Sequence, residues 1–177
     1  LKPVEKLVFN KYKKKAINKL NKMNDLRIIG ITGSFGKTST KMILHTILNE
    51  HFKGFYTPGS FNTPNGVLLT VNNEKDIFNE YFICEMGAKK VGQIKELSDL
   101  VHPKYGILTS IGKAHLETFK SIENVCKTKF ELIESLPEDG YAILNYDDEY
   151  MRNYKLQNKT NIIWVGYDKG DYYAKDV

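Results

Sequence analysis

Residues 26–40 constrain the fold of this 177-residue chain more than any other stretch. The apolar run from Leu26 to Ile31 predicts a buried strand, and a glycine-rich turn follows it. Apolar residues at helical spacing then predict a helix that runs to about Glu50; they are Met42, Ile43, Ile47 and Leu48. A strand, a glycine turn and a helix in this order are the context of a phosphate-binding loop.

The turn has the residue types that such a loop uses: Gly33, Ser34, Phe35, Gly36, Lys37, Thr38 and Ser39. Glycines allow backbone N–H groups to approach an anion closely, and the N-terminus of the helix adds partial positive charge. Lys37 is predicted to reach the outer phosphates of ATP, and the Thr38 hydroxyl to hold Mg²⁺. The commoner form of the loop has a glycine where Ile31 stands, and the alternative is an ordinary strand-to-helix turn. The strand and the helix on either side favour nucleotide binding.

Positive charge is concentrated at the beginning of the chain. Eight lysines against Glu5 and Asp25 give residues 1–25 a net charge of +6, while the whole chain carries +5. We expect a basic helix over residues 3–22, as a leader or linker before a domain at 26–177. A solvated basic face is the favoured interpretation, and contact with anionic lipid or with a neighbouring domain is the alternative. A nucleic-acid platform would interleave basic and aromatic residues on a folded surface, so nucleic acid is not predicted as a partner.

The composition suits one domain with a substantial core. Hydrophobic residues make up 41% of the chain and aromatic residues 12%. The sequence has no apolar run of the roughly 20 residues that a membrane helix needs, and no signal-peptide pattern at its start. Cys84 and Cys126 are too few and too far apart for a metal cluster or a disulfide framework. We interpret both as buried, reduced thiols, which predicts a cytoplasmic protein.

Predicted strands alternate with predicted helices along the chain. We expect strands at 26–32, 52–57, 81–84, 105–109, 141–145 and 162–165, with helices starting near residues 66, 91 and 122. The alternation predicts an α/β fold: a doubly wound, mainly parallel sheet with helices on both faces. Ligands bind such sheets at the carboxyl ends of the strands. The polar residues that we select for chemistry follow strand ends: Lys37, Thr38, Glu85, His115, Asn145 and Asp147.

Taken singly, several of these residues have ordinary explanations. Glu85 ends an apolar strand and could bind Mg²⁺, but a lone glutamate there would more often cap the next helix. A lone His115 would more often be structural. Lys129 would by itself be interpreted as a surface lysine. The order of the motifs along the chain is more specific than any one of them.

In that order the motifs resemble those of the Mur ligases, the ATP-dependent amide-bond-forming enzymes of peptidoglycan synthesis. The likeness covers about residues 26–177, and residues 30–38 resemble the ATP loop of the family. Two stretches resemble the substrate loop and the metal-binding strand end of the branch that adds D-alanyl-D-alanine: Ser60-Phe61-Asn62-Thr63 with Gly66-Val67, and Glu85-Met86-Gly87-Ala88. Later motifs of the branch are similar to Ile111-Gly112-x-Ala114-His115-Leu116-Glu117, Lys129-x-Glu131 and Asn145-x-Asp147-Asp148.

The resemblance implies a P-loop NTPase-like central domain and a reaction. ATP phosphorylates the carboxylate of a UDP-muramoyl tripeptide, D-alanyl-D-alanine attacks the acyl phosphate, and ADP and phosphate leave. The implied catalytic residues are Lys37, His115 and Lys129, the last as a carbamate. The implied Mg²⁺ ligands are Thr38, Glu85, His115 and Lys129. The implied contacts of the adenine are Asn145 and Asp147, and those of the acceptor-side substrate are Asn62 and Thr63.

The chain also departs from the family pattern. Lys120 stands where glycine is usual, and Thr63-Pro64-Asn65 replaces a commoner run. Family members have an N-terminal and a C-terminal domain besides the central one, so we expect those domains as partners and little or no turnover by this chain alone.

Three alternatives stay open. The first is another ligase of the superfamily, of the folate, γ-glutamyl or lipid II-amidating type. The second is an ATP-binding piece without turnover. The third, a GTPase, would need an Asn-Lys-x-Asp element, and Asn158-Lys159-Thr160-Asn161 lacks its aspartate.

Overall fold

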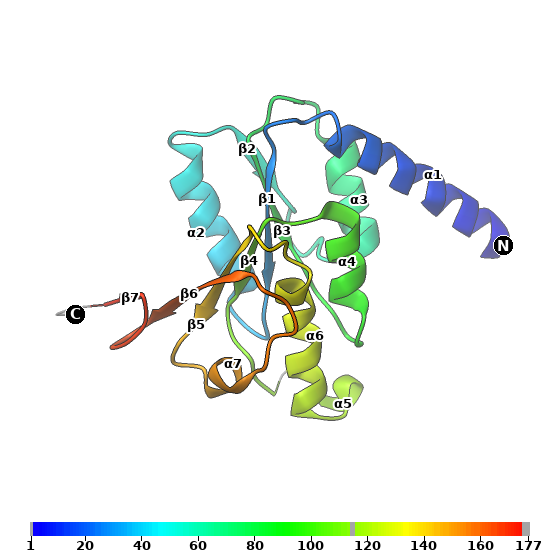
Figure 1. Cartoon of the computed structure of the whole chain (residues 1–177). Helices are drawn as coiled ribbons and strands as arrows, with labels where there is room; N and C mark the ends of the chain where they lie inside the picture. Colours follow the sequence, from blue (N-terminus) through cyan, green and yellow to red (C-terminus); the bar gives the residue numbers. More distant parts are fainter. Residues whose placement is uncertain (1, 114–115, 175–177) are drawn as a thin grey trace.

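The computed structural model describes residues 2–113 and 116–174, which form one seven-stranded parallel sheet with helices packed on it (Figure 1). The strands are β1 (Arg27–Thr32), β2 (Gly54–Tyr56), β3 (Tyr81–Glu85), β4 (Tyr105–Leu108), β5 (Tyr141–Asn145), β6 (Asn161–Gly166) and β7 (Tyr172–Tyr173). The helices are α1 (Lys2–Leu20), α2 (Lys37–Asn49), α3 (Pro64–Asn73), α4 (Gln93–Val101), α5 (Leu116–Phe119), α6 (Ile122–Glu134) and α7 (Glu149–Asn153).

The strand order places the glycine turn at the point where the topology reverses. The order is β2-β3-β1-β4-β5-β6-β7, and every neighbouring pair is parallel. From β1 the chain runs to the edge strand β2, returns to β3 beside β1, and then crosses to β4 on the other side of β1. Such a switch point leaves a crevice at the carboxyl ends of the central strands, where α/β proteins bind ligands. Ile31 of β1 is in register with Glu85 of β3, so the glycine turn and this carboxylate share that crevice.

Helices cover both faces of the sheet, as the sequence predicts. In Figure 1, α2 lies on one face, and α3, α4 and α6 lie on the other. The larger core lies beneath the second group and includes Val67, Phe82, Leu97 and Phe130. A smaller cluster of Ile31, Tyr81 and Ile83 lies beneath α2, where Leu44 and Leu48 pack against it. The predicted doubly wound α/β fold is confirmed, and the sheet is parallel throughout.

Helix α1 packs on the rest of the domain through its C-terminal half. Ala16 is buried in the core, and α1 contacts α3. The Lys19 ammonium donates to the backbone oxygens of Asn72, at 2.8 Å, and Glu74, at 2.6 Å, where α3 ends. A cation at a helix C-terminus is favourable because the last carbonyls have no partners within the helix. The separate leader at residues 1–25 stays a prediction.

Only part of the apolar pattern that predicted α2 lies on its buried face. Met42, Ile43 and Ile47 are exposed, while Leu44 and Leu48 face the sheet together with Lys41. The helix begins directly at the phosphate-binding turn. The orientation of its first residue, Lys37, therefore determines which face of α2 packs on the sheet. Residues 41, 44 and 48 then follow at the spacing of one helix face.

Three short elements had not been predicted from sequence: α5, α7 and β7. Helix α5 lies between the strand predicted at 105–109 and the helix predicted from about residue 122. All three are too short for periodicity to reveal them. The exposed residues of β7, Tyr172 and Tyr173, add no apolar alternation.

Candidate functional site

The glycines of the turn have separate structural reasons. Gly36 is the N-cap of α2 and has a φ of 81°, in the left-handed region that disfavours a side chain. Gly33 is required by close packing, because a Cβ there would lie 2.0 Å from Thr109 Oγ1. The first N–H groups of α2 therefore face the carboxyl edge of the sheet, an arrangement suited to an anion.

A second segment, residues 109–112 after β4, holds this turn in place. The Ser34 N–H donates to Ser110 O, and the Phe35 N–H donates to Ser110 Oγ, both at 2.9 Å. The Gly112 N–H donates to Ser34 Oγ at 2.9 Å. The loop that follows β1 is thus organised by Thr109, Ser110 and Gly112, of which only Gly112 belongs to a sequence motif.

Lys37 lies over the loop. Its ammonium donates to Gly33 O at 2.8 Å, and the side chain lines a cavity of about 340 Å³. Partial burial lowers the pKa of Lys37, and the nearby Glu85 carboxylate opposes that shift. A cation that is partly desolvated at the mouth of a backbone N–H cradle is well placed to bind phosphate oxygens.

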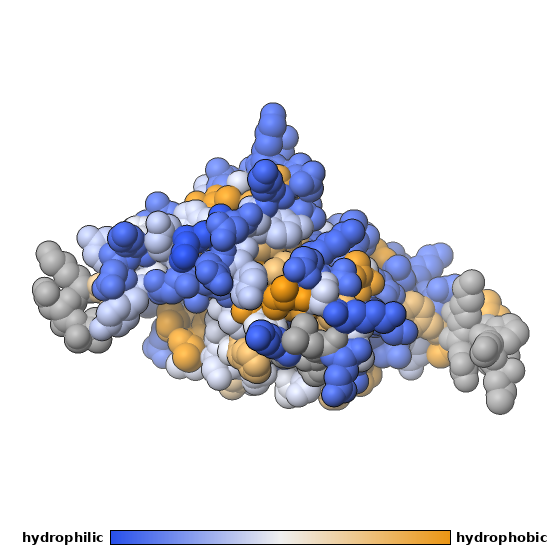
Figure 2. All heavy atoms as spheres, turned by 90° about the horizontal axis from the view of Figure 1, so that it is seen from below, coloured by the Kyte–Doolittle hydropathy of each residue, from blue (hydrophilic) through white to orange (hydrophobic). Residues whose placement is uncertain are grey.

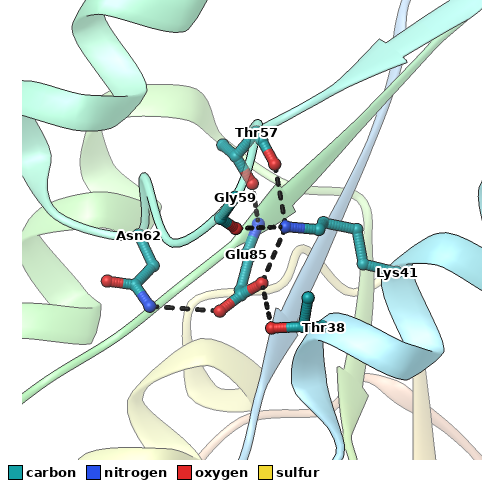
Figure 3. Close-up of polar contacts among 6 residues, drawn as sticks. All are labelled: Thr38, Lys41, Thr57, Gly59, Asn62 and Glu85. Carbon is teal, nitrogen blue, oxygen red and sulfur yellow. Dashed lines mark hydrogen bonds and ion pairs between the residues drawn. The ribbon is translucent and has the colours of Figure 1, made fainter.

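Glu85 lies at the centre of a polar cluster that joins three elements (Figure 3). Its Oε2 accepts from the Thr38 hydroxyl at 3.0 Å and from the Lys41 ammonium at 2.8 Å, and its Oε1 accepts from Asn62 Nδ2 at 3.1 Å. Burial opposes ionisation of this carboxylate, but the bonds from Lys41, Asn62 and Thr38 outweigh it and lower the pKa of Glu85. Glu85 is therefore an anion in a nearly dry environment.

The pair Thr38 and Glu85 fits a magnesium ion. Both side chains offer oxygen atoms, the ligand type that Mg²⁺ prefers. Their oxygens lie 3.0 Å apart, the separation of adjacent ligands in an octahedron with metal–oxygen distances of about 2.1 Å. Within the described residues no group of three His, Cys, Asp or Glu side chains could hold a metal, so this pair would need further ligands of other kinds.

Lys129 reaches the same cavity from α6. It is 4% exposed, and the cavity also contains Ser34, Asn62 and Thr63. Burial, with repulsion from Lys37, lowers the pKa of Lys129 to about 8, and the Glu131 carboxylate offsets part of the shift. Lys129 is thus not the surface lysine that its sequence context would suggest.

Glu131, two residues further on, has a different role. Its carboxylate accepts from the N–H groups of Gly92, at 2.6 Å, and Lys95, at 2.9 Å. Gly92 is the N-cap of α4 and has no side chain with which to cap it. Glu131 therefore caps α4 from a neighbouring helix.

Not every predicted site residue lines the cavity. Asn145 and Asp147 lie at the end of β5, outside the cavity lining, where Asn145 Oδ1 accepts from the Asp147 N–H at 3.0 Å. The Phe35 side chain is 62% exposed, and Ser39 is also exposed. Thr63 caps α3 by accepting from the Gly66 N–H at 3.4 Å. His115 is outside the described residues.

The cluster includes a residue that the sequence analysis missed. Lys41 is fully buried, and no motif had drawn attention to it. A signal existed in its spacing, because Lys41 lies one helical turn after Lys37 and on the same helix face as Leu44 and Leu48. A lysine on a sheet-facing stripe must find an anion or carbonyl groups.

A larger groove, of about 810 Å³, lies at the opposite edge of the sheet. Arg27, Phe52, Glu80 and Lys104 are among the residues that line it. The phosphate-binding turn lies at the other end of β1, so this groove lacks the turn. The smaller cavity is the candidate site. Figure 2 looks onto the carboxyl edge, where hydrophilic residues dominate around small hydrophobic patches.

A parallel sheet with a glycine-rich loop between a central strand and a helix defines a nucleotide-binding α/β domain of the P-loop type. Residues 31–177 match the family model described as the Mur ligase middle domain. The chain belongs to the Mur ligase family, as the resemblance had implied.

Similar proteins and solved structures indicate which branch of the family this chain resembles. A UDP-N-acetylmuramoyl-tripeptide–D-alanyl-D-alanine ligase of Bacillus subtilis is 37% identical over 155 residues, which are 85% of this chain and 32% of the relative. The structure of the MurF ligase of Thermotoga maritima in complex with ADP is 32% identical, with a TM-score of 0.82 over 93% of this chain and 39% of that one. A MurF structure from Acinetobacter baumannii has 28% identity and a TM-score of 0.85. The chain spans about a third of the length of these relatives.

Proposed function

We propose that this chain is the nucleotide-binding domain of a ligase that joins D-alanyl-D-alanine to a UDP-muramoyl tripeptide at the expense of ATP. The observation that carries the proposal is the shared cavity of the phosphate loop, the substrate-loop residues Asn62 and Thr63, and Lys129. The likeness to D-alanyl-D-alanine ligases, one of them in complex with ADP, supports this branch over folate-type or lipid II-amidating ligases.

The residues of the loop suit transfer of the terminal phosphoryl group. A carboxylate oxygen of the tripeptide attacks the γ-phosphorus, the bond to the ADP oxygen breaks, and an acyl phosphate forms. Lys37 and the loop N–H groups stabilise charge on the phosphoryl oxygens. Thr38 and Glu85 would hold Mg²⁺, which when bound neutralises phosphate charge. The amine of D-alanyl-D-alanine then attacks the acyl carbon, loses a proton and displaces phosphate.

Lys129 is proposed to act as a carbamate. Its neutral amine attacks carbon dioxide and releases a proton, which turns a buried cation into an anion. The lowered pKa of Lys129 supports this, because the neutral amine is the reactive form. A carbamate offers oxygen atoms to Mg²⁺, whereas an ammonium would repel it. His115 is the further proposed metal ligand.

The remaining residues are assigned by their position relative to the cavity, which Asn62 and Thr63 line and Asn145 and Asp147 do not. Asn62 and Thr63 are proposed to contact the acceptor-side substrate. Asn145 and Asp147, at the end of β5 and just after it, are proposed to contact the adenine. The described helices include none that could span a membrane. A cytoplasmic location, turnover that needs further domains, and membrane contact by residues 1–25 as a disfavoured option all stay predictions.

Calorimetry of ADP binding with Mg²⁺ tests the proposal directly. Lys37→Ala should weaken binding by about thirtyfold, because a charge-assisted hydrogen bond contributes about 2 kcal/mol. Lys95→Met is the control, since Lys95 is exposed and pairs with Asp99 on the surface. Equal affinities in the wild type and Lys37→Ala would refute a phosphate loop here. In a longer form of the protein, ADP release that needs both the tripeptide and D-alanyl-D-alanine would identify the substrates.

A further inference from the structure

Lys41 is a buried charge that the proposed mechanism does not use. Its side chain is 0% exposed, and it projects from α2 towards the end of β3, one helical turn beyond Lys37 (Figure 3). A lysine is rarely buried to this extent, because the loss of hydration is costly unless every donor is satisfied. The contacts of the Lys41 ammonium must therefore account for its burial.

Every N–H of the Lys41 ammonium has an acceptor. It donates to Glu85 Oε2, Thr57 O and Gly59 O, each at 2.8 Å. An ammonium has three donors, so none is left for a ligand. Lys41 is thus fixed in place, unlike Lys37, whose ammonium contacts only loop carbonyls beside the cavity.

The three acceptors belong to two separate parts of the site. Glu85 ends β3, and Thr57 and Gly59 begin the loop that leads from β2 to Asn62. That loop also contacts Glu85 directly, since Asn62 Nδ2 donates to Oε1 and the Thr57 hydroxyl accepts from the Glu85 N–H at 3.0 Å. One ammonium therefore links the helix of the phosphate loop to the carboxylate and to the substrate loop.

The charge of Lys41 also affects what Glu85 can bind. A carboxylate offers about four acceptor positions, and three are used by Thr38, Lys41 and Asn62. Thr38 and Lys41 share Oε2, so Mg²⁺ at this edge would take the Oε2 position that the Thr38 hydroxyl proton now occupies. Since Lys41 neutralises the carboxylate, the protein alone presents little net negative charge to a free cation, whereas nucleotide phosphates supply it.

We propose that Lys41 is a positioning residue that fixes Glu85 and the loop 57–62 so that Mg²⁺ binds between Thr38 and Glu85 only together with the nucleotide. The inference rests on the proposed nucleotide site and adds a residue to it. We therefore expect Lys41 to contribute to the increase in nucleotide affinity that Mg²⁺ causes. The affinity in the absence of the metal should depend on the loop and on Lys37.

Calorimetry with ADP, in Mg²⁺ and in EDTA, separates the two parts. In Lys41→Met, Mg²⁺ should tighten ADP binding at least about tenfold less than in the wild type, with the EDTA affinity unchanged within about twofold. Lys95→Met, which removes an exposed lysine–carboxylate pair, should behave as the wild type. The inference is overturned if Lys41→Met keeps the full effect of Mg²⁺, or loses affinity equally in both buffers.

A measurement on the wild type guards against a variant that does not fold. Lys41→Met leaves Glu85 buried and unpaired, so Lys41→Gln, with a shorter side chain that still donates, is the second variant. In the wild type, the slowly exchanging Lys41 ammonium protons should be visible by NMR and should shift with Mg-ADP much more than with ADP in EDTA. Absent or metal-insensitive signals contradict the inference. No ADP binding by the wild type in either buffer would instead refute the proposed function itself.

Discussion

The lysines that the account of the site uses have different environments. Lys37 is half-buried over the loop, Lys41 is buried and fully paired, and Lys129 is buried beside the cavity. Sequence motifs identified Lys37 because its position relative to the glycines is characteristic. They could not identify Lys41, whose role depends on an acceptor 44 positions away in the chain. Lys129 was selected by resemblance, and its burial was not predictable from its neighbours.

The environment of Lys129 leads to a prediction about pH. Its pKa of about 8 in the folded protein lies below the ordinary lysine value, so the unfolded chain binds more protons between pH 8 and pH 10.5. The free energy of unfolding should therefore rise with pH across this window, in buffer free of carbon dioxide, by up to a few kcal/mol. Lys129→Met should remove that part of the slope in urea titrations. Lys127→Met, on the exposed side of α6, is the control, and equal slopes in the two variants would contradict the prediction.

At the level of elements, the alternation of strands and helices could be read from the sequence. Buried strands such as β1 and β3 are mostly apolar, and most boundaries lie within a few residues of the prediction. Which face of α2 packs on the sheet could not be predicted from the sequence. Met42, Ile43 and Ile47 have the spacing of a buried face, yet they are exposed. The phosphate-binding turn fixes the start of the helix, and polar groups at the site decide which face meets the sheet.

Helix α4 depends on a cap from outside itself. Glu131→Ala should leave the N–H groups of Gly92 and Lys95 without acceptors and cost about 2 kcal/mol. For a domain of this size the melting temperature should fall by about 4–8 °C. Glu96→Ala, an exposed residue of the first turn of α4, should cost about 0.5 kcal/mol or less. Thermal unfolding of both variants measures the difference, and similar losses would show that Glu131 is no cap.

For the whole molecule, the sheet topology is stronger evidence for the position of the site than the size of a cavity is. The larger groove lies at the amino edge of the sheet, but the phosphate loop, Glu85 and Lys129 meet at the carboxyl edge. The gathering of strand-end residues at one edge was predictable, because parallel strands end together. The position of residues 109–112 against the loop was not, since it depends on the pairing of β1 with β4.

The most direct test of the account is an NMR map of backbone amides during titration with Mg-ADP. We predict the largest shifts at residues 33–39, which surround the phosphates, with smaller shifts at 109–112, which support the loop. Shifts centred on Arg27, Phe52 and Lys104 at the opposite edge would contradict the account, and so would no shift at all at saturating nucleotide.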